Sequence, residues 1–226
     1  MKLTYYGHSC FEVEINEKHL LFDPFITRNP LAKAVDIKKI KADYIFVSHA
    51  HFDHIADAIT IAKQTGATVV SNIEIVGWLG KNGLKNVQPL NPGGDYLADF
   101  GQMRCVNAIH SSSFEDGAYG GCASGFVVES PEGNFYYSGD TALTLDMKLV
   151  SETTKLKFAV LCVGGTLTMG AEEAIRAAAL LQCKEVMGVH YDTFPPIKID
   201  HAAAKDKFRS KGLTLHLLPI GSSQDF

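Results

Sequence analysis

Three absences narrow the class of protein: the sequence has no long hydrophobic run, no strong charge bias and no paired-cysteine pattern. No run of about 18 apolar residues occurs, and the N-terminus lacks the basic and apolar regions of a signal peptide, so we expect neither a membrane span nor export. The net charge of −4 provides no general attraction to nucleic acid or to an anionic membrane. We therefore expect partners of neither kind.

Cysteine occurs in an odd number, five, and no two cysteines have the C-x-x-C spacing. This pattern argues against a disulfide framework and against a thiolate zinc site, and it fits a reducing compartment. We expect a soluble cytoplasmic protein whose cysteines are mostly small buried side chains. The five are Cys10, Cys105, Cys122, Cys162 and Cys183.

The chain is long enough, and with 46% hydrophobic residues apolar enough, to bury the core of one large α/β domain. No repeat, low-complexity tract or linker divides it, so we expect residues 1–226 to form a single domain. Strand-like runs precede helix-like runs in the first half, and the same order returns from residue 95 onward. This order predicts two sheets packed face to face with helices outside, a four-layer αβ/βα sandwich.

Several of the predicted elements have clear bounds. We expect antiparallel strands within residues 2–23, a buried strand over 43–47 and another strand over 103–109. Helices are expected over 55–64, 73–78, 143–153, 169–182 and 201–211, and the closing strand over 213–217.

One short segment, His49-Ala50-His51-Phe52-Asp53-His54, directly follows the apolar run 44–47. Three imidazoles and a carboxylate within six residues are hard to explain as packing, because each buried polar group would need its own partner. They are typical of metal ligands, since imidazole suits zinc, iron and nickel, and carboxylate adds manganese. The segment follows a predicted strand, which is where open α/β sheets bind ligands.

Three further candidate ligands, His110, Asp140 and His190, each come just after an apolar strand-like run. Strand ends can converge on one edge of a sandwich, so we expect these side chains to meet the segment 49–54. Together the candidates comprise five imidazoles and two carboxylates, too many for one tetrahedral ion and suitable for two ions that share a bridge.

The order H-x-H-x-D-H, His, Asp, His resembles that of the metallo-β-lactamase superfamily over essentially the whole chain. Residues 7–11 (GHSCF), 23–25 (DPF), 138–141 (SGDT) and 190–196 (HYDTFPP) are similar to a bacterial and archaeal branch of metal-dependent hydrolases related to ascorbate-6-phosphate lactonase. The resemblance implies the metallo-β-lactamase fold and two divalent ions, zinc or manganese. It assigns metal one to His49, His51 and His110, metal two to Asp53, His54 and His190, and the bridge to Asp140.

Two such ions would lower the pKa of a shared water toward neutrality, so that hydroxide is available as the nucleophile at pH 7. Asp53 is then predicted to orient the hydroxide and to move its proton.

For His8 two interpretations stay open: a catalytic oxyanion donor or substrate contact, and a structural hydrogen bond. Asp23 either holds a ligand imidazole in its tautomer or caps the following turn. Tyr191 and Thr193 either line the pocket or pack.

The predicted function is hydrolysis of a small ester, lactone or phosphodiester. Arg28 and Lys33 would suit an anionic substrate, although a solvated loop is the simpler explanation for them. True β-lactamases typically use a cysteine at the second metal, whereas this chain offers Asp140, which argues against antibiotic hydrolysis. The alternatives are a di-iron oxidoreductase of the same fold and a non-catalytic binding protein. A homo-oligomer is compatible with the sequence.

Overall fold

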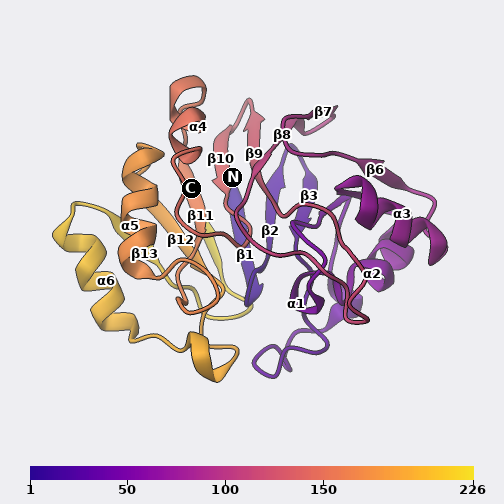
Figure 1. Cartoon of the computed structure of the whole chain (residues 1–226), viewed down its shortest axis with the longest axis horizontal. Helices are drawn as coiled ribbons and strands as arrows, with labels where there is room; N and C mark the ends of the chain where they lie inside the picture. Colours follow the sequence, from indigo (N-terminus) through magenta and orange to yellow (C-terminus); the bar gives the residue numbers. More distant parts are fainter.

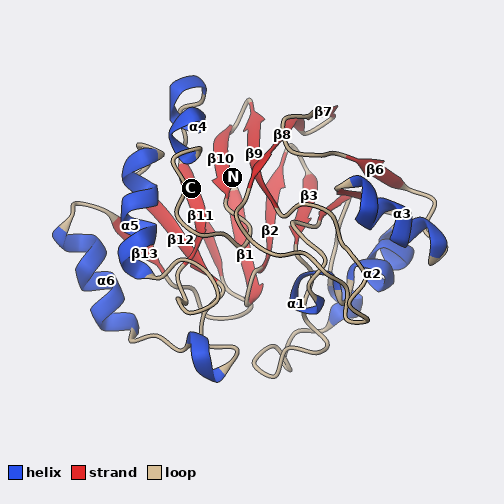
Figure 2. Cartoon of the chain, in the orientation of Figure 1, coloured by secondary structure: helices blue, strands red, loops and turns tan.

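Two seven-stranded mixed sheets pack face to face in the computed structural model, which describes residues 1–226. Figure 2 shows the strands at the centre and the helices on the two outer sides. The predicted four-layer αβ/βα sandwich is thereby confirmed. None of the helices combines the length and the apolar character that a membrane crossing requires.

The first sheet contains the strands of the N-terminal half together with the last strand of the chain. Its order is β14-β1-β2-β3-β4-β5-β6, antiparallel from β14 to β3 and parallel from β3 to β6. Sequence reasoning missed β14, because its residues are polar and it exists only through pairing with the edge of β1. The strands are β1 Lys2–Gly7, β2 Cys10–Ile15, β3 Lys18–Phe22, β4 Tyr44–Phe46, β5 Thr68–Ser71, β6 Val87–Pro89 and β14 Ser223–Asp225.

The second sheet follows the same plan with the second half of the chain. Its order is β13-β12-β11-β10-β9-β8-β7, antiparallel from β7 to β10 and parallel from β10 to β13. The strand predicted over 103–109 starts and ends two residues earlier, as β8. The strands are β7 Asp95–Ala98, β8 Gly101–Asn107, β9 Ser124–Ser130, β10 Gly133–Tyr137, β11 Phe158–Cys162, β12 Glu185–Val189 and β13 Thr214–His216.

The helices cover the outer faces of the two sheets. In Figure 1, α1, α2 and α3 lie on the side of the first sheet, and α4, α5 and α6 lie on the side of the second. Two 3₁₀ turns, Ile37–Lys39 and Pro195–Ile197, lie in the connecting loops. The helices are α1 Phe52–Ile55, α2 Ala58–Thr65, α3 Ile73–Lys81, α4 Met147–Thr153, α5 Ala171–Leu180 and α6 His201–Ser210.

The helix predicted over 55–64 is wrong as a single element, because the chain breaks between α1 and α2 at Asp57. The buried Asp57 carboxylate accepts hydrogen bonds from the backbone N–H groups of Ile26 and Thr27, at 2.6 and 2.9 Å, and from the Thr27 hydroxyl. The break therefore ties the loop after β3 to the helices. The second helix, α2, ends at Gly66, which adopts a left-handed C-cap with φ of 79°.

Aromatic side chains from both sheets fill the space between them. Phe22 contacts Phe46 within its own sheet at a ring-centroid distance of 5.1 Å, and it contacts Phe135 and Tyr137 of the opposite sheet at 5.8 and 5.6 Å. Side chains alternate between the two faces of a strand, so Leu21, the residue before Phe22 on β3, points toward the helix layer instead. The sheets are thus fixed to each other near the strand ends that carry the polar residues.

Replacing Phe22 by alanine is expected to lower the free energy of unfolding by about 3–5 kcal/mol, because a fully buried ring is lost from between the sheets. Urea unfolding followed by circular dichroism measures the effect. The control is Leu97→Ala, since Leu97 is 79% exposed and its loss should cost less than about 0.5 kcal/mol. Equal costs for the two variants would contradict this packing.

Candidate metal centre

Strand ends from both sheets bring the predicted ligands together at one edge of the sandwich. His49 to His54 follow β4, His110 follows β8, Asp140 follows β10 and His190 follows β12. Asp140 lies in the middle: its Oδ2 is 2.9 Å from Nε2 of His190, 3.2 Å from that of His54, 3.6 Å from that of His110 and 3.9 Å from that of His49.

The nitrogen and oxygen atoms form two compact groups around Asp140. In the first, the ligand atoms of His49, His51 and His110 all lie within 4.8 Å of one another. The second has the same compactness and consists of His8, Asp53, His54 and His190. Each group contains a set that the resemblance assigns to one metal, and the second adds His8.

Several buried atoms at the centre have no protein partner, which is the condition that a cation would satisfy. Nε2 of His54 and Oδ1 of Asp140 are buried and accept or donate no hydrogen bond. Nε2 of His49 lies only 2.9 Å from Nδ1 of His51. Two ring nitrogens this close repel unless a proton or a cation lies between them. Because imidazole and carboxylate donors suit zinc and manganese, the residues fit divalent ions of this kind.

Asp23, at the end of β3, connects ligands of both groups. Its Oδ2 accepts a hydrogen bond from Nδ1 of His54 at 2.8 Å and another from the Ser48 hydroxyl at 2.6 Å. Since the Ser48 hydrogen is thus used, the Ser48 oxygen accepts from Nδ1 of His49 at 3.0 Å. Both imidazoles therefore carry their proton on Nδ1 and turn Nε2 toward the centre. Tyr137 also donates to Asp23, at 2.5 Å.

His8 is buried and hydrogen-bonds through both ring nitrogens. Its Nε2 lies 3.0 Å from Oδ2 of Asp53, and its Nδ1 lies 3.0 Å from the Thr193 hydroxyl. Because a carboxylate only accepts, Nε2 of His8 donates to Asp53, and Nδ1 accepts from Thr193. His8 is thus a partner of Asp53. These hydrogen bonds do not test the catalytic role predicted for His8, which remains a prediction.

Burial and mutual charge set the protonation of the site. Burial lowers the pKa of His8 to about 4, and it lowers the pKa of His49, His51 and His110 as well. These rings are therefore neutral at pH 7, which is the form that binds a metal.

The carboxylates respond in the opposite way to their surroundings. Burial alone would raise the pKa of Asp53 and of Asp140, but the neighbouring imidazoles outweigh it and hold both pKa values well below the usual range. Burial likewise opposes protonation of His54, yet Asp140, Asp23 and Asp53 together raise its pKa well above the usual value. Negative charge is thus concentrated where His54 meets these three carboxylates.

The backbone turns sharply where the strands deliver these residues. His8, Asp23 and His190 have left-handed backbones with φ of 56°, 41° and 56°. Gly139, just before Asp140, has φ of 57°, and a Cβ there would lie 2.3 Å from the carbonyl oxygen of Ser124. Only glycine fits this position, which explains the Gly-Asp pair at the end of β10.

A cavity of about 590 Å³ opens beside the two groups of ligands. Asp53, Asp140 and three of the predicted ligand imidazoles contribute to its wall, together with aromatic, aliphatic and serine side chains of the surrounding loops. The remaining wall residues are Phe52, Ser111, Ser113, Phe114, Glu115, Leu167 and Phe194.

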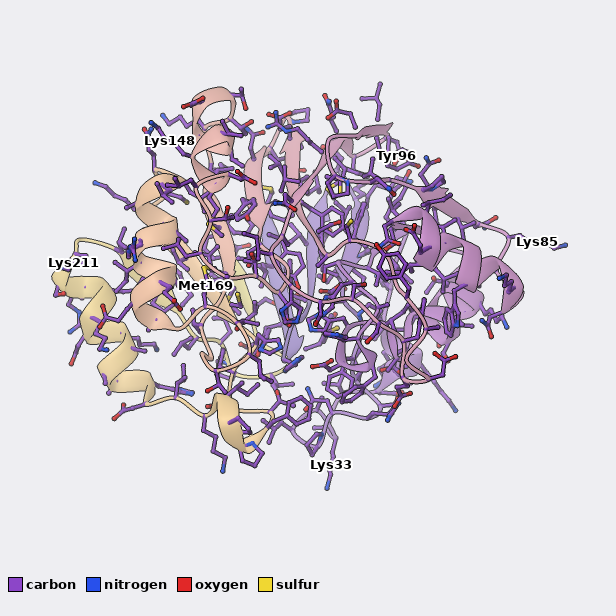
Figure 3. All side chains as sticks on the ribbon, viewed as in Figure 1. Lys33, Lys85, Tyr96, Lys148, Met169 and Lys211 are labelled. Atoms are coloured by element: carbon purple, nitrogen blue, oxygen red, sulfur yellow. The ribbon has the colours of Figure 1, made fainter.

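Several residues whose roles stayed open in the sequence lie away from this cavity. Tyr191 is buried and stacks on Tyr5 at 6.2 Å, and Thr193 binds His8, so neither lines the cavity. Lys33, labelled in Figure 3, projects from the outer rim of the molecule. Arg28 does not line the cavity but is hydrogen-bonded to Glu115, which does.

Known proteins share this chain's sequence and fold over almost its full length. A family model described as the beta-lactamase superfamily domain matches residues 2–190. Proteins named UPF0173 metal-dependent hydrolase from Methylacidiphilum infernorum and Flavobacterium johnsoniae are 56% and 51% identical over 223 residues, covering 99% of each chain.

A solved structure agrees with these relatives. Igni18, a metallo hydrolase from the archaeon Ignicoccus hospitalis, has 35% identity and a TM-score of 0.89, with 100% of this chain and 98% of that chain covered. The sequence relatives are named as metal-dependent hydrolases, and the protein of this structure is named as a metallo hydrolase. The chain is therefore a member of the beta-lactamase superfamily and a metal-dependent hydrolase.

Proposed function

We propose that the protein hydrolyses a small ester, lactone or phosphodiester at a centre of two divalent metal ions. His49, His51 and His110 would hold one ion, Asp53, His54 and His190 the other, and Asp140 would bridge them. The observation that carries this proposal is the position of Asp140, within 2.9–3.9 Å of imidazole nitrogens from both groups. Because these ligands come from both halves of the chain, residues 1–226 would act as one catalytic unit.

The chain's own residues supply orientation and proton transfer. Two ions, zinc or manganese, would supply an activated water and a Lewis acid for the scissile carbonyl or phosphoryl oxygen. The Asp53 carboxylate lines the cavity, so it would orient the attacking water and relay its proton to the leaving group. His8 is a positioning residue in this scheme, since its Nε2–H fixes the carboxylate of Asp53.

Metal analysis and one ligand variant test the proposal. Protein reconstituted with zinc or with manganese is expected to hold two ions per chain and to turn over one class in a panel of lactones, thioesters, esters and phosphodiesters. His51→Ala should lower that turnover by more than about 100-fold, which exceeds the usual cost of losing an outer-shell partner. The matched control is His216→Ala, because His216 on β13 pairs with Glu185 on β12 and does not line the cavity.

The outcomes separate the alternatives. Full turnover by His51→Ala, or a protein that binds no divalent ion, would contradict the proposed centre. Two irons accompanied by a visible absorption band and no hydrolysis would favour an oxidoreductase instead.

A further inference from the structure

The cavity wall beyond the predicted ligands contains no lysine or arginine. Its larger side chains are apolar: Phe52 begins α1, Phe114 lies on a loop of the second half, and Phe194 and Leu167 complete the surface. The only polar side chains among them are two serine hydroxyls and Glu115. A substrate group that reaches this wall finds aromatic faces and hydroxyls, and no cation that would pair with a negative charge.

Arg28, which contacts this wall without lining it, is already neutralised. It donates two hydrogen bonds of 2.8 Å to the two carboxylate oxygens of the wall residue Glu115, which is a bidentate pair. The guanidinium also lies over the ring of Phe52, another wall residue, with its carbon 5.0 Å from the ring centroid. Since both charges are matched within the pair, the pair adds no net charge to this part of the wall.

Leu167 indicates that the wall is built to receive an apolar group. It lies on the turn between β11 and α5, and 52% of its surface is exposed although it faces the cavity. An exposed leucine is ordinary on its own. Here it lines the same cavity as Phe114 and Phe194, so an apolar part of a bound substrate would bury it.

We propose that the substrate is an uncharged ester or lactone with an apolar acyl or alkyl group, and that the Arg28–Glu115 pair contributes to this specificity by leaving no free cation beside the cavity wall. This inference rests on the proposed hydrolase function and selects among its substrates. A carboxylate or phosphate directed at the wall would lose hydration without gaining a partner, whereas an apolar group gains by burial. Esters that carry a carboxylate or phosphate on the group directed at this wall are thereby disfavoured.

A matched pair of esters tests the preference in the metal-loaded protein. Phenyl butyrate and phenyl hemisuccinate differ mainly in a methyl or a carboxylate at the end of the acyl chain. We expect kcat/KM to be higher for the butyrate by roughly tenfold or more. Bis(4-nitrophenyl) phosphate serves as the anionic phosphodiester and is expected to react more slowly than the butyrate.

Two variants test the role of the ion pair. Glu115→Gln leaves the charge of Arg28 unpaired beside the cavity wall, so the preference for butyrate over hemisuccinate should shrink by about threefold to fivefold, and less at high salt. The double variant Arg28→Met/Glu115→Gln removes both charges, so the preference should return toward that of the unaltered protein. The ratio of two substrates is insensitive to the fraction of active protein, which guards against partial misfolding.

The outcomes keep this inference distinct from the proposed function. Equal or faster hydrolysis of the hemisuccinate, or a phosphodiester that reacts faster than both esters, would overturn the uncharged substrate while leaving a hydrolase. An unchanged ratio in Glu115→Gln would overturn the role of the ion pair. No hydrolysis of any member of the panel of lactones, thioesters, esters and phosphodiesters by protein carrying two ions would contradict the proposed function itself.

Discussion

Asp140→Asn is expected to lower kcat/KM by more than about 100-fold, because an amide cannot replace a bridging carboxylate shared by both groups of imidazoles. The substitution preserves shape and removes one negative charge from a buried position beside His54 and His190. Metal content should fall from two ions per chain to one or fewer. Elemental analysis after gel filtration, together with steady-state kinetics, measures both effects.

The control for Asp140→Asn is the same substitution at Asp146, a few residues further along the chain. Asp146 is exposed and accepts a hydrogen bond from the amide of Asn107, so its loss should leave metal content and turnover close to those of the unaltered protein. Two retained ions and normal turnover in Asp140→Asn would remove Asp140 from the centre.

Asp23→Asn should weaken metal binding by roughly 10–100-fold, although Asp23 is not among the predicted ligands. The carboxylate orients His54 directly and His49 through Ser48, so both groups lose a fixed imidazole. An asparagine NH₂ would also face donors that now point at the carboxylate, costing about 1–3 kcal/mol of folding free energy. Competition with a chelator measures the affinity, and urea unfolding of metal-free protein measures the stability.

Tyr137→Phe separates the two effects. It removes one donor to Asp23 and leaves the carboxylate and both imidazole contacts intact. Metal affinity should then change far less than in Asp23→Asn, with a stability cost of about 1 kcal/mol. If Asp23→Asn retained metal as tightly as Tyr137→Phe, the orienting role of Asp23 would be wrong.

Local sequence pattern predicted much of this arrangement because the strand ends carry the polar residues. His49, Asp140 and His190 each follow a largely buried apolar strand, and His110 follows β8, of which Met103 and Cys105 are buried. The layering followed from the repeated order of strands and helices. These are features that neighbouring residues determine, so they are legible in the sequence.

Contacts between segments that are far apart in the chain could not be predicted from the sequence in the same way. His8 hydrogen-bonds to Asp53, 45 residues away, and Arg28 to Glu115, 87 residues away. No local sequence pattern predicts either pair. The break between α1 and α2 depends on the buried carboxylate of Asp57, which binds a loop some 30 residues earlier. A polar strand such as β14 likewise forms because an edge is available, not because of its own propensity.

The left-handed backbones of His8, Asp23 and His190 have an energetic consequence for the whole molecule. Each such conformation costs about 1–3 kcal/mol in a residue with a Cβ, and a domain of this kind has a net stability of only about 5–15 kcal/mol. The edge of the sandwich that delivers the polar side chains is therefore conformationally strained, and the aromatic layer between the sheets must hold it in that shape. Selection for stability alone would favour glycine or asparagine at these three positions. The residues present there are therefore explained by the function of the site and not by stability.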